Sequence, residues 1–390
     1  MILAVTLALA QFAAVPAPPQ TGSPAERAAA EDALVRGRAW LLGAQLENGA
    51  WGHWRNPMPY DRFWSNPATH RAWQVATTAL TCTALLDAFG ADDPEVAEAV
   101  DRGLAFLCEH ADVRRPDEWD TDNVWGYVYA LEALARAAAE PRYRTEGARA
   151  DLAGPIVRMG RRMLERLAEY QTPDGGWAYY DEDPTSMPPS WATSFTTAVA
   201  VFGLLRAREL GWPLEERRLV AALRAIAHCR LPNGAYSYSV RPVPSPGSLW
   251  NIDRVQGSLG RIPVCDLALT LGRDLAPGWT PNEDDLVAGL ERLFREHVFL
   301  DVARGRPSPH EAYHFNSGYF YFFGHCYAGR VLALLPPEEA ARFAPQLAHH
   351  VVKTMARDGS AVDFFTNDYG RPYATAFAVS ALADALRAWP

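Results

Sequence analysis

Two carboxylic acids stand close together at Asp120 and Asp122, and Asn123 follows them directly. An apolar, aromatic helical pattern that contains Trp125 begins at the same point. Like charges resist joint ionisation, so one of two paired acids can keep its proton where a lone acid would lose it. A carboxylic acid held neutral in an apolar pocket can then act as a proton donor. Acids and Asn at a helix start are also ordinary N-caps, so the residues alone leave a structural role open.

Other acids follow the turns or open a helix. Residues 281–285 begin an amphipathic pattern, and we interpret their acids as helix caps. Two carboxylates about 5 to 10 Å apart would instead suit hydrolysis of a glycosidic bond. The candidates for such a pair are Asp181, Glu182, Asp183, Asp363 and Asp368.

Aromatic residues gather where the most apolar helical patterns begin. The chain has 13 Trp, 15 Tyr and 16 Phe, enough rings to line a cavity as well as to pack a core. Aromatic faces stabilise cations, and they also stack against sugars. The candidate ligand-binding residues chosen on this ground are Trp73, Trp125, Tyr127, Trp191, Phe195, His314, Tyr319 and Tyr373.

The elements that position these residues alternate between two kinds of helix. Amphipathic patterns predict outer helices with one buried stripe, at 27–45, 94–110, 149–171, 214–229, 282–297 and 337–356. Patterns that are apolar almost all round predict inner helices, at 69–89, 123–139, 191–208, 255–272, 315–335 and 372–388. An open solenoid would need polar capping helices at both ends, and the last helix is apolar. The sequence therefore predicts an all-α fold, an (α/α)6 toroid of six outer and six inner helices.

Glycine turns recur between the helical patterns. They are QLENGAW (45–51), QTPDGGW (171–177), RLPNGAY (230–236) and RDGSAV (357–362), and their glycines are separated by 126, 59 and 125 residues. These intervals fit a unit of about 62 residues used five times, which is typical of a repeat architecture.

The two best copies resemble the QW motif of squalene-hopene and oxidosqualene cyclases. Their residues are Gln45, Gly49 and Trp51 in one copy, and Gln171, Gly175 and Trp177 in the other. In that family the Gln satisfies backbone groups at neighbouring helix ends and the Trp stacks over it, and every helix end does leave unpaired backbone groups. The resemblance implies the α/α toroid shared by terpenoid cyclases and protein prenyltransferase β subunits.

The resemblance also implies roles for the paired acids. Class II cyclases protonate an alkene with an Asp-x-Asp-Asp motif, so Asp122 would be the donor, with Asp120 and Asn123 orienting it; Asn123 stands where the family has a third acid. Prenyltransferases hold zinc with an Asp-x-Cys pair and a later His, and this chain has no Asp-x-Cys. Neighbours such as His325 and Cys326 point about 100° apart on a helix, so such a pair offers at most one ligand. We therefore expect no metal and no cofactor.

Three classes of function remain open. The first is an isoprenoid-processing enzyme that resembles a single-domain class II terpenoid cyclase with an aromatic central cavity. The second is an exported, non-catalytic toroid that binds a lipid, a glycan or a protein. The third is an α/α-barrel glycan hydrolase or lyase. The expected partner is a hydrophobic small molecule, such as an isoprenoid, or a glycan.

The net charge and the first residues of the chain narrow these classes of function. The net charge of -9 argues against nucleic acid, and no polybasic run indicates a membrane surface. Residues 1–17 are apolar and end in a small-residue pattern, which predicts a signal peptide and export to the periplasm or the extracellular space. Residues 18–26 read as a linker, and we expect one toroid domain over 27–390. Five Cys without a CxxC indicate no disulfide framework.

Overall fold

The computed structural model describes residues 22–53, 67–113, 123–179, 191–240, 251–364 and 369–390. Within these ranges the regular structure is helical, and the extended pairing amounts to three isolated bridges. None of the helices found there is both long enough and apolar enough to span a bilayer.

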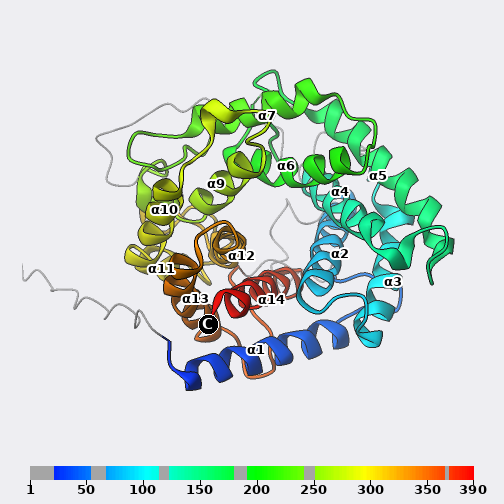
Figure 1. The fold of residues 1–390 in the computed structure, drawn as a ribbon, viewed down its shortest axis with the longest axis horizontal. Coiled ribbons are helices and arrows are strands. Elements are labelled where there is room, and N and C mark those ends of the chain that lie inside the picture. The colour runs from blue at the N-terminus through cyan, green and yellow to red at the C-terminus, as the bar shows by residue number, and fades with distance from the viewer. Residues whose placement is uncertain (1–21, 54–66, 114–122, 180–190, 241–250, 365–368) are drawn as a thin grey trace, which may run out of the picture.

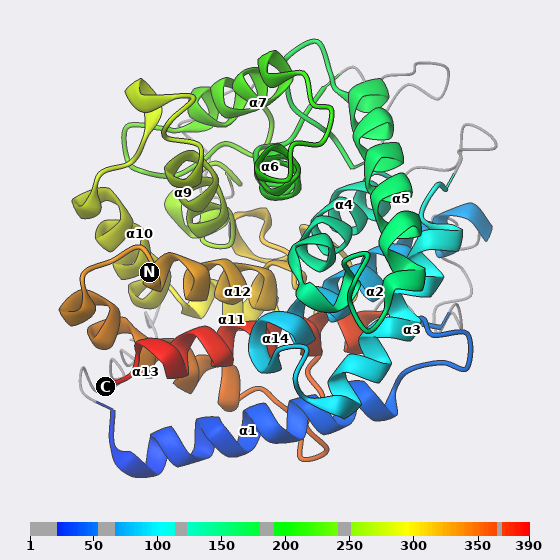
Figure 2. The same ribbon diagram turned by 45° about the vertical axis from the view of Figure 1, so that its right-hand side comes forward.

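The helices form two concentric rings (Figure 1). The outer ring contains α1 (Pro24–Gly43), α3 (Pro94–His110), α5 (Ala150–Tyr170), α7 (Glu216–Cys229), α10 (Glu283–Arg295) and α13 (Pro337–Val352). The inner ring contains α2 (Pro67–Phe89), α4 (Asn123–Ala139), α6 (Ser194–Glu209), α9 (Arg261–Leu271), α12 (Phe320–Leu332) and α14 (Gly370–Ala388). Inner neighbours contact one another in that order, and α14 returns to contact α2, so the ring is closed (Figures 1 and 2). The predicted (α/α)6 toroid is confirmed.

Burial explains why the two rings differ. In α5 the buried residues include Ile156, Gly160, Met163, Leu164 and Leu167, which share one stripe, while Arg158 and Arg161 between them are exposed. In α6 every residue from Ser194 to Leu205 is buried, because this helix packs against neighbours on all sides.

Two inner helices depart from the predicted limits. A short helix, α8 (Val255–Ser258), precedes α9, and Leu259 and Gly260 separate the two. An added Cβ on Gly260 would lie 2.8 Å from the Phe320 Cβ, so the small residue lets α9 and α12 approach closely. The helix predicted from 315 begins only at Phe320, because His314 and Phe315 have positive φ. A further short helix, α11 (Val298–Ala303), follows α10.

The first glycine turn joins α1 to α3. The Gln45 amide donates to the carbonyl oxygens of Gly49 and of Ala99 in α3, both at 2.8 Å. The Trp51 indole N–H donates to the Leu41 carbonyl near the end of α1 at 2.7 Å. The Leu41 carbonyl, one of the last four of α1, thereby gains a donor.

The second glycine turn repeats this geometry between α5 and α7. The Gln171 amide donates to the carbonyl oxygens of Gly175, at 2.6 Å, and of Arg218 in α7, at 2.9 Å. The Trp177 indole N–H donates to the Leu167 carbonyl at 2.8 Å. In both turns the Gln therefore ties two adjacent outer helices together, and the Trp ties the turn to the helix that precedes it.

The other junctions of the outer ring use different contacts. In the third turn Arg230 pairs with Asp285 of α10 at 2.7 Å. In the fourth, the Arg36 guanidinium of α1 donates to two turn carbonyls at 3.1 Å each, and this contact closes the ring between α13 and α1. Between α3 and α5, Asp112 pairs with Arg162 and Arg166 at 3.0 and 2.6 Å. The remaining junction, between α10 and α13, holds a group of buried histidines.

Candidate functional site

Aromatic rings meet in the middle of the toroid, at the amino ends of the inner helices. Trp125, in the first turn of α4, stacks on Tyr129 and Tyr179 with centroid distances of 5.7 and 6.0 Å and interplanar angles of 18° and 16°. Phe195 of α6 lies 6.0 Å from the same indole. Trp125 and Tyr179 are only half-buried, so part of this ring surface remains accessible.

Phe195 links this stack to the opposite side of the ring. Its centroid lies 5.1 Å from Tyr238, 5.2 Å from Phe320 and 6.2 Å from Phe323. The Tyr179 and Tyr238 hydroxyls are hydrogen-bonded at 2.5 Å. We define the aromatic cluster as Trp125, Tyr129, Tyr179, Phe195, Tyr238, Phe320, Phe323, Tyr327 and Phe377.

A buried guanidinium supports one edge of the aromatic cluster. Arg261 is fully buried, and its charged end lies 5.4 Å from the Tyr238 ring centre and 5.6 Å from that of Phe320. It donates to the carbonyl oxygens of Gly257 and Ile252 at 2.8 and 2.6 Å. Burial lowers the pKa of this side chain. These contacts fix the positions of two rings through cation–π attraction.

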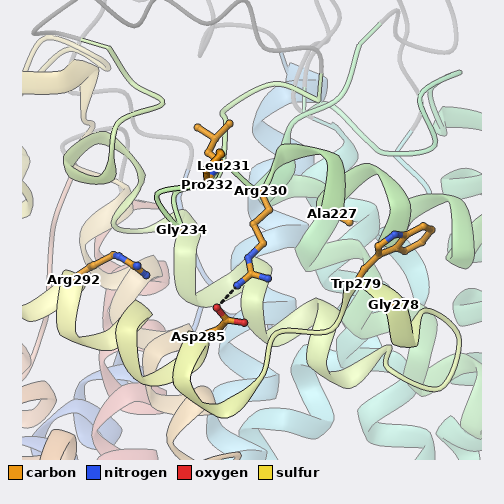
Figure 3. Close-up of a pocket in the computed structure, with 9 residues that line it drawn as sticks. All are labelled: Ala227, Arg230, Leu231, Pro232, Gly234, Gly278, Trp279, Asp285 and Arg292. Carbon is orange, nitrogen blue, oxygen red and sulfur yellow. Dashed lines mark ion pairs between the residues drawn. The ribbon is translucent and has the colours of Figure 1, made fainter.

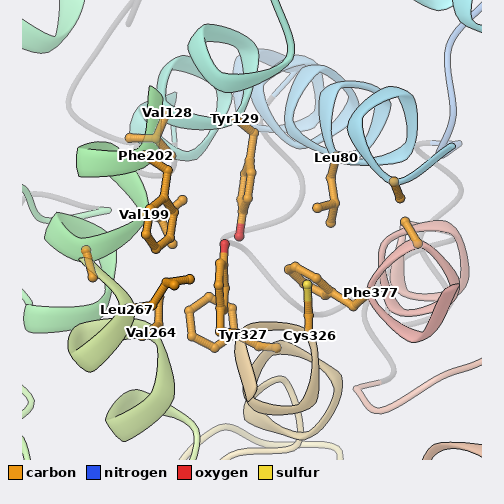
Figure 4. Close-up of a cluster of buried hydrophobic side chains, with 14 of the residues drawn as sticks. Leu80, Val128, Tyr129, Val199, Phe202, Val264, Leu267, Cys326, Tyr327 and Phe377 are labelled. Carbon is orange, nitrogen blue, oxygen red and sulfur yellow. The ribbon is translucent and has the colours of Figure 1, made fainter. Parts of the chain in front are cut away.

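The carboxyl-terminal side of the aromatic cluster is closed by contacts across the whole ring. The Tyr129 and Tyr327 hydroxyls, from α4 and α12, point toward one another (Figure 4). One turn further along each helix, Glu132 pairs with Arg330 at 2.8 Å. The Glu132 side chain is 3% exposed and that of Arg330 is 18% exposed. A ligand that reaches the rings would therefore enter from the amino ends of the inner helices.

A buried acid adjoins the aromatic cluster. Asp363 has no exposed surface. It accepts hydrogen bonds from the Tyr373 hydroxyl at 2.8 Å and from the Phe322 backbone N–H at 3.2 Å. Burial raises the pKa of this carboxyl to about 7, although the Tyr373 bond opposes the rise. The Tyr373 ring lies 6.2 Å from Phe377, so the acid and the rings are contiguous.

The structure brings together some of the predicted ligand-binding residues and separates others. Trp125 and Phe195 are at the centre of the aromatic cluster, and Tyr319 contacts Phe320 at 4.6 Å. Tyr127 faces the opposite way, because its hydroxyl donates to the Val113 carbonyl. It packs against Tyr170 of α5 and so joins inner to outer helix.

One more predicted residue, His314, packs against a different ring. His314 packs edge-on against Phe299 of α11 at 5.0 Å, away from Trp125. Trp73 on α2 and Trp191 before α6 are half-buried.

The acids of the predicted motif are only partly described. Asp120 and Asp122 lie outside the described residues, as do Asp181, Glu182, Asp183 and Asp368. Asn123 is the first residue of α4 and is 3% exposed. Its amide donates to the Tyr127 and Tyr170 hydroxyls at 3.3 Å each, so it holds α4 against α5.

Two aromatic residues that the sequence analysis did not select share a position in the repeat with Asp363, which it named only as a hydrolase acid. Tyr179 and Tyr238 each lie two residues after the aromatic residue of a glycine turn, Trp177 or Tyr236. Asp363 lies at the corresponding place in the fourth turn. In all three copies this position faces the centre of the toroid. An alignment of the four turns beyond their glycines would have shown it.

A separate pocket lies on the outer wall, between α7 and α10 (Figure 3). Its volume is about 530 Å³, and its lining includes Arg230, Trp279 and Arg292. The Arg230–Asp285 ion pair crosses it. This pocket belongs to the third outer-helix junction and is remote from the aromatic cluster.

The two closed rings of helices place the protein among the α/α toroids, and aromatic side chains and a buried acid lie at their centre. Solved structures agree at the level of fold. An α-1,6-mannanase from Salegentibacter in complex with α-1,6-mannotetrose has a TM-score of 0.56 at 11% identity, and a type II terpene cyclase from Scytonema in complex with geranylgeranyl dihydroxybenzoate has 0.50 at 16%. Each comparison covers 93% of this chain and 99% of the other.

Sequence comparison defines the family. The profile of the squalene-hopene cyclase C-terminal domain matches residues 17–226, more than half of the chain. The chain therefore belongs to the squalene-hopene cyclase family.

Two curated relatives match over shorter stretches. A probable squalene–hopene cyclase of Sinorhizobium fredii is 27% identical over 202 residues, 47% of this chain and 28% of that protein. The drimenyl diphosphate synthase of Streptomyces showdoensis is 29% identical over 170 residues, 42% of this chain and 26% of that protein. The matches thus span about a quarter of each relative's length.

Proposed function

We propose that the protein processes an isoprenoid by protonating an alkene, in the manner of a class II terpenoid cyclase. The aromatic cluster carries this proposal, because the faces of Trp125, Tyr179 and Phe195 can stabilise the positive charge that forms when an alkene takes up a proton. The family and the relative named drimenyl diphosphate synthase support an isoprenoid as the substrate class.

The proton donor is one of two acids. Asp122 has the place of the donor in the family motif. Asp363 has the physical properties of a donor, since its buried carboxyl has a pKa of about 7 beside an aromatic surface. In the step itself the acid O–H bond breaks and a C–H bond forms at the alkene carbon. The carboxylate left on Asp363 would be stabilised by the donors that it already has, Tyr373 and the Phe322 N–H. Loss of a proton from the final cation to water completes the reaction.

A cyclisation assay tests the proposal. The purified full chain is incubated with linear polyprenes and their diphosphates, and products are separated by chromatography with mass detection. We expect a product of unchanged mass with fewer double bonds. Asp122→Asn and Asp363→Asn are compared with Asp284→Asn, which changes an exposed acid at the start of α10. Loss of turnover in one of the first two variants assigns the donor, and full activity in both refutes protonation by either.

A non-catalytic binding role is the second candidate. The observation that favours it is the close packing of the rings and the closure of the centre by Tyr129 and Tyr327. In this case the polyprene binds and is recovered unchanged. Tryptophan fluorescence that responds to a polyprene without product formation supports this role, and a response to mannan oligosaccharides alone would favour a glycan ligand.

We also propose that residues 1–17 direct export. The apolar stretch and its small-residue end support this proposal. Amino-terminal sequencing of the protein from culture medium or periplasm should find a chain that begins after residue 17. An intact amino terminus on protein that stays inside the cell would contradict export.

A further inference from the structure

Buried histidines occupy the junction between α10 and α13, one of the two outer-helix junctions that lack a glycine turn. His297 stands between α10 and α11, Asp301 lies in α11, His325 in α12 and His350 in α13. His297 is 3% exposed, His325 0% and His350 6%. The group is part of the toroid wall and is separate from the aromatic cluster.

The hydrogen-bond donors and acceptors of these histidines leave one position that a cation can occupy. The His325 Nδ1 lies 2.6 Å from the Tyr321 carbonyl oxygen, so Nδ1 carries a hydrogen and Nε2 of the neutral ring is an acceptor. His297 Nε2, at 2.9 Å, must then donate to His325 Nε2. This leaves a lone pair on His297 Nδ1 that faces the Asp301 Oδ2 at 3.0 Å. Two acceptors at that distance require a proton or a metal ion between them.

A second observation points to the metal ion. Both ring nitrogens of the buried His350 lack a hydrogen-bond partner among the described residues. Buried polar atoms without partners are rare and call for a ligand. The His350 ring stacks on that of His297, with centroids 3.5 Å apart and planes at 25°. One ligand atom each from His297, Asp301 and His350 lies within 4.8 Å of the others.

We propose that His297, Asp301 and His350 bind a zinc ion that ties α11 to α13. Zinc bonds of about 2.0 to 2.2 Å place neighbouring ligand atoms about 3.3 Å apart, so the ligand atoms must draw closer on binding. The His297 and His350 rings must also turn out of their present stacking, because the ion lies near the plane of each imidazole that binds it. His297 binds through Nδ1, and its Nε2–H donates to His325, the arrangement that usually orients a metal-bound histidine. Water completes the tetrahedron, and the half-exposed Asp301 gives the ion a path from solvent.

Binding of zinc requires one neighbouring side chain, that of Lys353, to move. The Lys353 ammonium lies 3.3 Å from Asp301 Oδ2, and its side chain is 34% exposed. It can turn into solvent at little cost, because exposed ion pairs contribute little free energy.

Metal titration of the full chain tests this site. Chelator-treated protein is titrated with Zn²⁺ by calorimetry, and with Co²⁺ by visible absorption, which reports tetrahedral geometry. We expect one site per chain, visible bands with Co²⁺ and a rise in thermal stability on binding.

Variants separate this site from adventitious binding. His350→Gln and Asp301→Asn should each weaken Zn²⁺ binding at least tenfold, about 1.4 kcal/mol. His349→Gln, which changes the adjacent exposed histidine, should bind as the wild type does. Circular dichroism of the metal-free variants checks that they are folded. No Zn²⁺ binding by the wild type, or equal binding by folded His350→Gln and Asp301→Asn, would overturn the proposal.

Discussion

Replacing Asp363 by Asn should change how stability depends on pH. The carboxyl is fully buried, and burial raises its pKa from an ordinary 3.8 to about 7. Between these values the folded protein holds a proton that the unfolded chain has released. The free energy of unfolding therefore falls by about 1.4 kcal/mol per pH unit across this interval, and by about 4 kcal/mol in total at most.

The sign follows from the direction of the shift. A carboxyl whose folded pKa is raised adds its full stability below pH 3.8 and loses it as the pH rises through 7. Asp363→Asn keeps the shape of the side chain and removes the proton. The variant should therefore lose stability less steeply with pH than the wild type, by about 1.4 kcal/mol per unit between about pH 5 and 7. Asp266 is another buried acid with a raised pKa, and it is present in both proteins. The difference between the wild type and Asp363→Asn therefore reports on Asp363.

Urea denaturation at several pH values measures this difference. Tyr373→Phe is the matched control, because it removes the hydroxyl that donates to Asp363 and leaves the acid in place. It should keep the steep wild-type dependence. Parallel stability curves for the wild type and Asp363→Asn at every pH would refute the assignment of a protonated, buried acid at this site.

Three further perturbations test other parts of the account. Gly175→Ala should lower the free energy of unfolding by about 1–3 kcal/mol in urea denaturation. The reason is that φ is +92° and an added Cβ would lie 2.7 Å from a carbonyl oxygen of α7. A loss no greater than that of an exposed helix substitution would contradict the close approach. Glu132→Gln should lower the free energy of unfolding by about 3–5 kcal/mol, because it leaves Arg330 unpaired, and adding Arg330→Met should restore much of this loss. Additive losses in the double variant would exclude coupling across the ring. Trp125→Leu should weaken polyprene binding at least tenfold, about 1.4 kcal/mol, in a fluorescence titration, and unchanged affinity would remove the aromatic cluster from the ligand site.

The two rings of helices were predictable because burial imposes a periodic pattern of apolar and polar residues on the sequence. Outer helices such as α5 alternate buried and solvated residues, while inner helices such as α6 have no polar face. The same pattern could not predict the break between α8 and α9 or the late start of α12. Those depend on how closely α9 and α12 approach and on the positive φ of His314 and Phe315. Such features are set by contacts between segments far apart in the chain.

The candidate site was only partly predictable for the same reason. Trp125 and Phe195 follow from their places at helix starts. The contact of Glu132 with Arg330 joins residues 198 positions apart, and a sequence without homologues carries no signal for it. The sequence indicates Asp363 only as a possible hydrolase acid, because its raised pKa depends on burial that α12 and α14 create together. The histidines of the α10–α13 junction are separated along the chain and meet only in the fold.

Turnover in deuterated water shows whether the protein protonates an alkene, because protonation at carbon leaves deuterium in the product. The purified protein is incubated with a linear polyprene in D₂O, and the product is examined by mass spectrometry and NMR. Protonation by a solvent-exchanging acid predicts a cyclised product with deuterium bound to carbon at the position where the alkene was attacked. A cyclised product without carbon-bound deuterium, or unchanged polyprene after prolonged incubation, would contradict the account.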